Sequence, residues 1–275
     1  MSGGSSVPDP KFAMDARQPA PESRPMPRRI SRAVRTAFSV ALLGALAFLS
    51  PSPAASAASS SKAKAAPLFP ADGIPAGWTV RSWNDVIQPA APTTQWTVRN
   101  GILFGSEPRG SWLISEREYG DFVLDFEIRV PARGNAALAF RFPPTGDPAK
   151  DGFSLQLVDP RYYATNARPA ATDLAGSLSK TLAPSKNAFK PDDWNRCRID
   201  CRGPRVEITL NGQTIHRLKL DADSPPAVTG KPLKDRPLRG RLGFLEISRA
   251  GGQIQVRNAQ ITTGESAPGP VGKLD

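Results

Sequence analysis

The sequence predicts an all-β protein built as a single β-sandwich, and three observations favour this class. Three runs between residues 120 and 159 alternate apolar and polar side chains with a period of two, which is typical of strands that bury one face. About 195 residues lie between two ends of non-globular composition, a usual size for one sandwich. No segment of helical periodicity is longer than the one near the N-terminus.

Residues 1–57 have the features of a disordered extension followed by a signal peptide helix. Arg28, Arg29, Arg32 and Arg35 precede an apolar run of 13 residues, 37–49, and a small-residue site follows near Ala57. The run is shorter than the roughly 20 residues of a membrane span. We therefore expect export to the periplasm or the outside of the cell, with no stable membrane span after signal removal. An uncleaved anchor helix and a true start at Met26 remain open alternatives.

Residues 58–68 resemble a flexible linker, 69–263 the folded domain, and 264–275 a disordered polar tail. Alternation and the turn signals Asn100-Gly101 and Asn211-Gly212 place the strands of the domain. The expected strands are 77–80, 95–98, 102–104, 112–114, 122–130, 137–142, 153–158, 194–202, 206–210, 214–220, 240–247 and 253–262. A long irregular stretch, up to about residue 190, follows the seventh of them, and loops of that length are often functional or disordered.

The net charge of +11 does not indicate a nucleic-acid partner. Residues 1–66 contain nine Lys or Arg against three Asp or Glu, so the folded part is only mildly basic. Its cations are interspersed with acids, and no basic run lies beside stacking aromatics.

Cys197 and Cys201 lie in one expected strand, about 13 Å apart along an extended chain, which is too far for a disulfide. Both are in register with apolar Ile199, so we expect buried free thiols, with pairing between two molecules as the alternative. The only histidine, His216, is expected at the surface of its strand, because it lacks the other members of a metal-ligand set.

A series of short motifs runs in order from Trp78 to Ile261. They are Gly77-Trp78, Trp96 with Asn100-Gly101, Tyr119-Gly120-Asp121-Phe122 with Glu127, Gly134-Asn135, Arg141, Gln156 and Asp159, Gly176-Ser177, Trp194-Asn195, Asn211-Gly212 and Arg257-Asn258. In this series the chain resembles the 3-keto-disaccharide hydrolase domain family. The resemblance implies a concanavalin A-like jelly roll that takes part in carbohydrate breakdown by cleaving 3-keto-glycosides.

That chemistry suggests a role for a polar sheet face. A keto group at C3 acidifies the proton at C2, so a carboxylate can remove the proton while a cation stabilises the enolate. We predict Glu127 as the catalytic residue and Asn135, Arg141, Gln156 and Asp159 as substrate-binding residues, on one face if the three central runs share a sheet. A plain ion pair between Glu127 and Arg141 is the structural alternative. The cofactor is unknown, and a divalent metal remains open.

Several positions differ from the family pattern. Ser154 replaces a Glu, Leu178-Ser179 replaces Ile-Tyr, and Leu245 and Ile247 replace a Gln and a His. Glu246 could compensate only if its strand slipped by one residue, which would reverse its neighbours.

These differences leave an alternative to the enzyme. It is a non-catalytic jelly roll that binds a carbohydrate or keto-sugar, or interacts with the cell envelope, with Trp112, Tyr162 and Tyr163 available to stack on sugar rings.

Overall fold

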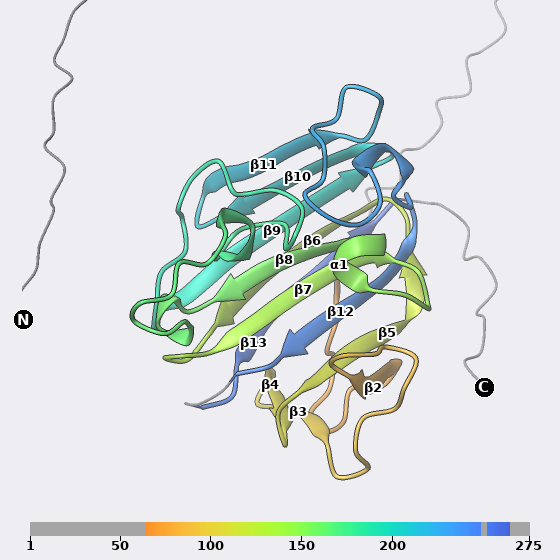
Figure 1. The fold of residues 1–275 in the computed structure, drawn as a ribbon. Helices are drawn as coiled ribbons and strands as arrows, with labels where there is room; N and C mark the ends of the chain where they lie inside the picture. The colour runs from red at the N-terminus through yellow and green to blue at the C-terminus, as the bar shows by residue number, and fades with distance from the viewer. Residues whose placement is uncertain (1–63, 249–251, 265–275) are drawn as a thin grey trace, which may run out of the picture. The chain divides into compact units, whose positions relative to one another are not determined.

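The computed structural model describes residues 64–248 and 252–264. The predicted extension, signal peptide, most of the linker and almost all of the tail lie outside these residues. The all-β prediction is confirmed: two antiparallel sheets pack face to face around one core (Figure 1). The only α-helix of the described part is the four-residue α1 (Pro148–Asp151), and three short 3-10 turns accompany it: η1 (Pro160–Tyr162), η2 (Ala171–Asp173) and η3 (Leu233–Asp235).

The larger sheet has eight strands, in the order β11-β10-β9-β6-β13-β4-β3, with β1 paired to β13. Their bounds are β1 Ala66–Pro67, β3 Gln95–Arg99, β4 Ile102–Glu107, β6 Phe122–Arg129, β9 Trp194–Arg202, β10 Arg205–Leu210, β11 Gln213–Lys219 and β13 Gln255–Thr263. The smaller sheet has the order β2-β5-β12-β7-β8 and forms the front layer of Figure 1. Its strands are β2 Trp78–Ser82, β5 Ser111–Tyr119, β7 Asn135–Phe142, β8 Phe153–Val158 and β12 Gly240–Glu246.

The three central runs do form strands, but the expectation that they share one sheet is wrong. Strand β6 belongs to the eight-stranded sheet, whereas β7 and β8 are neighbours in the five-stranded sheet. The chain passes from one sheet to the other in residues 130–134, where Arg133 adopts a left-handed φ of 59°. A period of two reports which residues face the core, and it is the same for strands of either sheet.

The two sheets differ in the face that points away from the core, which we call the outer face. In β6, core residues such as Phe122 and Phe126 alternate with half-buried polar ones, as the sequence predicts. In β7, β8 and β12 every residue is buried. The outer face of the five-stranded sheet carries a second apolar cluster, which consists of Val86, Trp112, Ile114, Ala137, Ala139, Phe142 and Leu245, with Ile247 against it.

The folded part begins earlier than the linker boundary at residue 68. Ala66 and Pro67 pair with Ile261 and Gln260 of β13, and Leu68 is buried in the core. The long stretch after β8 is irregular, as expected, but it is tied to the sheet. Its residues 176–179 hydrogen bond to β8 through the backbone of Gln156 and Ser154.

The cysteine prediction is confirmed, because Cys197 and Cys201 are buried free thiols in β9. The surface position expected for His216 is wrong. A bulge in the pairing of β10 with β11 turns both Ile215 and His216 inward, and His216 Nε2 lies 2.7 Å from the carbonyl oxygen of Gly176. Burial lowers the pKa of His216. Among the described residues, no helix is long and apolar enough to cross a bilayer.

Candidate functional site

Glu127 lies on the outer face of the eight-stranded sheet, apart from the other predicted site residues. Its carboxylate accepts a hydrogen bond of 2.6 Å from Nε of Arg257 in β13. The Arg257 guanidinium in turn stacks on Trp194, 4.0 Å from the ring centroid. Asn135, Arg141 and Gln156 belong to β7 and β8 of the other sheet. The predicted single face with Glu127, Arg141 and Gln156 is therefore not formed, because the chain changes sheets after β6.

Arg141 is fully buried, and its side chain holds two turns together, a contact that we call the Arg141 clasp. Its φ of 50° interrupts the alternation of β7, so that Phe142 takes the outward position and the guanidinium reaches two carbonyl groups. It donates to the carbonyl oxygens of Gly120, at 2.9 and 3.1 Å, and of Gly203, at 2.7 Å. Asp121 lies 3.2 Å away. The predicted ion pair of Arg141 with Glu127 is absent, and its donors serve the fold.

Asn135 and Gln156 are the two predicted residues that the structure brings together. Gln156 Nε2 donates a 2.6 Å hydrogen bond to Asn135 Oδ1, and both side chains are almost completely buried on the outer face of the five-stranded sheet. They lie where β7 begins and β8 ends, since Asn135 is the cross-strand partner of Val158. This amide pair leaves the NH₂ group of Asn135, one N–H of Gln156 and the carbonyl oxygen of Gln156 for further partners.

Asp159 is the first residue after β8, and its side chain fixes the start of the long loop. Its buried carboxylate caps η1 by accepting from the backbone N–H of Arg161 and of Arg133, and it pairs with the Arg161 guanidinium at 2.7 Å. Burial alone would raise the pKa of Asp159, but these hydrogen bonds outweigh burial and hold it below its usual value. Arg161 also bridges to Asp192 at 2.7 Å.

A groove of about 840 Å³ opens beside the Asp159–Arg161 pair. It lies at the end of the sheet that holds the amide pair, because Arg133 precedes Asn135 by two residues and Pro160 follows Asp159. Tyr162 and Tyr163 meet edge to face, with ring centroids 5.4 Å apart, and line it. The other lining residues are Arg133, Pro160, Arg161, Ala164, Thr165, Ala167, Pro169 and Leu174.

Glu246 is a buried carboxyl that periodicity did not select as a site residue. It faces the core side of β12, opposite to Leu245, as the alternation requires. Burial raises the pKa of Glu246 to about 7, although the Ser248 hydroxyl, 2.8 Å away, and the backbone N–H of Ile254 donate to it. Ser248 Oγ also accepts the backbone N–H of Asn135, which links Glu246 to the amide pair. A single carboxylate in an apolar strand was the available sequence signal.

Two guanidinium groups belong to other parts of the outer face of the five-stranded sheet: Arg81 lies on the edge strand β2, in the same cross-strand row as Gln156, and Arg241 lies at the end of the strands far from Asn135. The Nε atoms of Arg81 and Arg241 are buried and have no hydrogen-bond partner among the described residues. Burial lowers the pKa of Arg241, which is only 4% exposed. Buried donors of this kind are costly unless something accepts from them.

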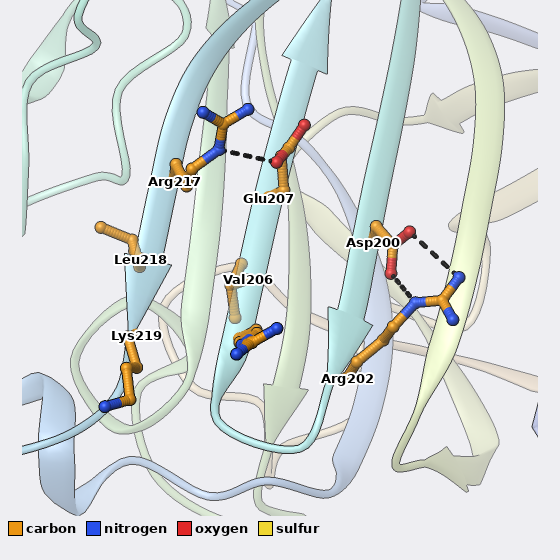
Figure 2. A pocket seen from close by; sticks show the side chains of 8 residues that line it. Asp200, Arg202, Val206, Glu207, Arg217, Leu218 and Lys219 are labelled. Carbon is orange, nitrogen blue, oxygen red and sulfur yellow. Dashed lines mark hydrogen bonds and ion pairs between the residues drawn. The ribbon is translucent and has the colours of Figure 1, made fainter. Parts of the chain in front are cut away.

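The outer face of the eight-stranded sheet has a different character. Figure 2 shows two of its ion pairs, Arg217 with Glu207 and Arg202 with Asp200, each with an N–O distance of 2.9 Å. Within residues 64–248 and 252–264, no three His, Cys, Asp or Glu side chains come together as a metal-ligand set. Glu127 and Asp159, the two carboxylates among the predicted site residues, are each engaged by an arginine.

Comparison with known proteins identifies the family. The model of the 3-keto-alpha-glucoside-1,2-lyase-like domain matches residues 64–262. The chain belongs to this family. As a 3-keto-alpha-glucoside-1,2-lyase-like domain, it carries Ser154, Leu245 and Ile247 where polar groups were expected, and all three lie on the outer face of the five-stranded sheet.

Solved structures support the fold of this lyase-like domain. One candidate glycosyl hydrolase from Parabacteroides distasonis is 20% identical, with a TM-score of 0.56, over 73% of this chain and 99% of its own. A second from the same organism is 17% identical, with a TM-score of 0.53, over 70% of this chain and 91% of its own. A search of curated proteins found no match. At these identities the likeness supports the jelly-roll fold alone.

Proposed function

We propose that this chain binds a carbohydrate, with the groove after β8 as its binding site. The observation that carries the proposal is the pair of tyrosines, Tyr162 and Tyr163, in a groove of about 840 Å³. Ligand sites of roughly 300–1,000 Å³ are usual for small molecules. Tyrosine rings offer apolar faces to the C–H groups of a sugar. The Tyr163 hydroxyl donates to the Asp173 carbonyl oxygen at 2.6 Å, and its oxygen can still accept a hydrogen bond from a sugar hydroxyl.

The chemistry around the groove favours binding over cleavage. Two carboxylates contact Arg161, which lines the groove. Asp159 is fully buried and also accepts from Arg133, and Asp192 pairs with Arg161 at 2.7 Å, so both are engaged by the fold. At the centre of the adjoining sheet face the side chains are apolar, including Ala137, Ala139 and Leu245. General acid–base catalysis needs a titratable group within hydrogen-bond reach of the substrate.

The experiment compares two aromatic-to-alanine variants in a glycan-binding screen of the full-length chain. Tyr162→Ala should weaken binding of the best glycan by about tenfold, because it removes one stacking surface. Trp83→Ala is the matched control, since Trp83 is 53% exposed and is not among the residues that line the groove. Equal affinity of the Tyr162 variant and the wild type would reject the groove as the site.

Cleavage of 3-keto-glycosides is a second candidate function, and the family match over residues 64–262 favours it. In this scheme Glu127 removes the C2 proton, a double bond forms between C1 and C2, and the C1–O bond to the leaving sugar breaks, with a proton taken up by the leaving oxygen. Arg257, 2.6 Å away, holds the Glu127 carboxylate in place. Glu127→Gln should then abolish release of the free sugar from a 3-keto-glucoside while the thermal unfolding of the domain stays unchanged.

Asp125→Asn is the control for this assay, because Asp125 lies two residues earlier on the same face and pairs with Arg198 at 2.6 Å. The control should keep its turnover. The assay is run with added divalent cation and with a chelator. A wild-type chain that cleaves no 3-keto-glycoside under either condition would remove this candidate and leave the binding proposal standing.

Export is part of the same proposal and rests on the apolar run 37–49. Expression of the full chain in a bacterial host should yield a mature protein that begins near residue 58. Mass spectrometry of the N-terminal peptide measures this, and an intact N-terminus on cytoplasmic protein would contradict it.

A further inference from the structure

Three cations stand in one row across the outer face of the eight-stranded sheet. Arg205 of β10 is the direct cross-strand partner of Lys219 in β11 and of Arg202 in β9. Because neighbouring strands are roughly 4.8 Å apart, the row spans about 10 Å. Like charges directly opposite one another destabilise a sheet. The row therefore has a cost to folding that an isolated surface cation does not have.

The members of the row differ in their acid partners. Arg202 pairs with Asp200 at 2.9 Å and Lys219 with Asp221 at 2.7 Å, and both basic side chains remain mostly exposed, at 71% and 65%. The guanidinium group of Arg205, between them, has no hydrogen bond or ion pair with any described residue. One positive charge at the centre of the row is therefore not balanced by a neighbouring carboxylate.

The row lies at a hollow of about 500 Å³ in this face. Figure 2 shows Lys219 and Arg202 on either side of the strand that carries Val206, with the Arg217–Glu207 pair further along the same strands. The lining residues are Asp200, Arg202, Arg205, Val206, Glu207, Arg217, Leu218 and Lys219. Four of them are cationic and two are anionic, so the hollow has an excess of positive charge.

We propose that this row is a docking site for an acidic polysaccharide, separate from the groove after β8. A pyranose unit of an extended glycan is about as long as the spacing between strands, so successive acidic sugars could each meet one cation of the row. Exposed guanidinium groups suit carboxylate and sulfate oxygens, which they can bind through two parallel hydrogen bonds.

Two features favour a polysaccharide over a nucleic acid. No aromatic side chain lines the hollow, so bases would find no stacking surface there. Asp200 and Glu207 lie two residues along their strands from the row. Their negative charges would repel the closely spaced phosphates of a nucleic acid. A single row of cations across three strands instead matches one linear chain with widely spaced charges.

The test measures binding of the full-length chain to dextran sulfate and to polygalacturonate, with neutral dextran and a single-stranded oligonucleotide as comparisons. The two acidic polymers separate sulfate from carboxylate recognition. We expect binding to at least one of them, no binding to dextran, and a decrease with added salt. The triple variant Arg202→Gln/Arg205→Gln/Lys219→Gln should bind on the order of tenfold more weakly or worse.

The matched control is Lys186→Gln/Lys190→Gln/Lys234→Gln, which removes the same charge from exposed positions that do not line the hollow. An equal loss in this control would show a bulk charge effect and overturn the proposal. So would binding that survives the row variant, no binding of either acidic polymer by the wild type, or an oligonucleotide bound as tightly as the better polysaccharide. If the triple variant fails to fold, Arg205→Gln alone must weaken binding several-fold.

Trp83→Ala, at an exposed position outside both the hollow and the groove, serves as an independent control here and should leave binding of the acidic polymer unchanged. The row variant and the Tyr162 variant change residues of separate sites, so failure of the docking proposal and failure of the groove proposal can be distinguished.

Discussion

The outer faces of the two sheets show how one sandwich can have two very different surfaces. In the eight-stranded sheet, β6, β9 and β10 alternate core residues with exposed or half-buried charges, many of them in pairs such as Arg198 with Asp125. In the five-stranded sheet, β7, β8 and β12 have no exposed residue, and their outer face holds the apolar cluster beside the buried Asn135–Gln156 pair. A change of charge on the first face therefore costs little stability, whereas the second face is buried as completely as the core.

The largest expected effect comes from placing the same charge on each face. Leu245→Asp puts a carboxylate into the buried outer cluster, where Leu245 is 8% exposed, and should cost about 4 kcal/mol of unfolding free energy. Thr209→Asp on the other sheet lies opposite Arg198 and should change stability by less than about 0.5 kcal/mol. Urea unfolding measures both, and similar losses would erase the difference between the faces.

A pH titration tests the buried carboxyl beneath the apolar face. The pKa of Glu246 is raised from 4.5 to about 7 in the folded chain, so the folded state holds its proton over a range where the unfolded state has lost it. The contribution of Glu246 to the free energy of unfolding is fully present below about pH 4.5 and is lost as the pH rises through about 7. The free energy of unfolding should therefore fall by on the order of 3 kcal/mol over this range.

Glu246→Gln keeps the side-chain shape and a carbonyl oxygen, so it should remove this decrease between pH 5 and 8. Thermal unfolding across that pH range gives the answer. A variant whose stability falls with pH as steeply as that of the wild type would show that another group is responsible.

Two arginine-to-methionine variants compare a buried clasp with an exposed pair. Arg141→Met leaves the carbonyl oxygens of Gly120 and Gly203 without their donors and should cost about 2 to 3 kcal/mol. Arg198→Met removes an ion pair on the solvated face and should cost less than about 1 kcal/mol. Equal losses in chemical denaturation would contradict the role assigned to the clasp.

The smallest effect tests the cation row itself. Arg205→Gln removes repulsion from Lys219 and Arg202 and should raise stability by about 0.5 kcal/mol. Glu207→Gln, on the same strand, breaks the pair with Arg217 and should lower it by a similar amount. Both changes should shrink in high salt, because the groups are screened by solvent ions.

The strands could be predicted from the sequence because side-chain alternation and Asn-Gly turns are local signals. The partition of strands between sheets could not, since β6 and β7 have the same period and belong to different sheets. The prediction that Arg141 lies on the polar face was wrong, because no neighbouring residue in the sequence indicates a left-handed φ at this non-glycine position. The surface position predicted for His216 was wrong for a similar reason, since the bulge beside it depends on its partner strand β10.

The candidate site was predictable only in part. Asn135 and Gln156 were expected on one polar face and do form a hydrogen-bonded pair, because β7 and β8 are adjacent in sequence and in the sheet. Glu127 was grouped with them by its position in the chain, but it lies in the other sheet. The groove arises from the path of residues 160–174 after β8, and an irregular segment carries no periodic signal.

The backbone pairing of residues 176–179 with β8 protects the molecule against unwanted association. A bare β8 would present unpaired N–H and C=O groups, to which a strand of another chain could attach. The loop occupies these groups at Ser154 and Gln156, and on the opposite margin Gln88 and Ala90 cover β2 in the same way. Irregular segments thus close both margins of the apolar sheet, so neither can recruit a further strand and begin a growing aggregate.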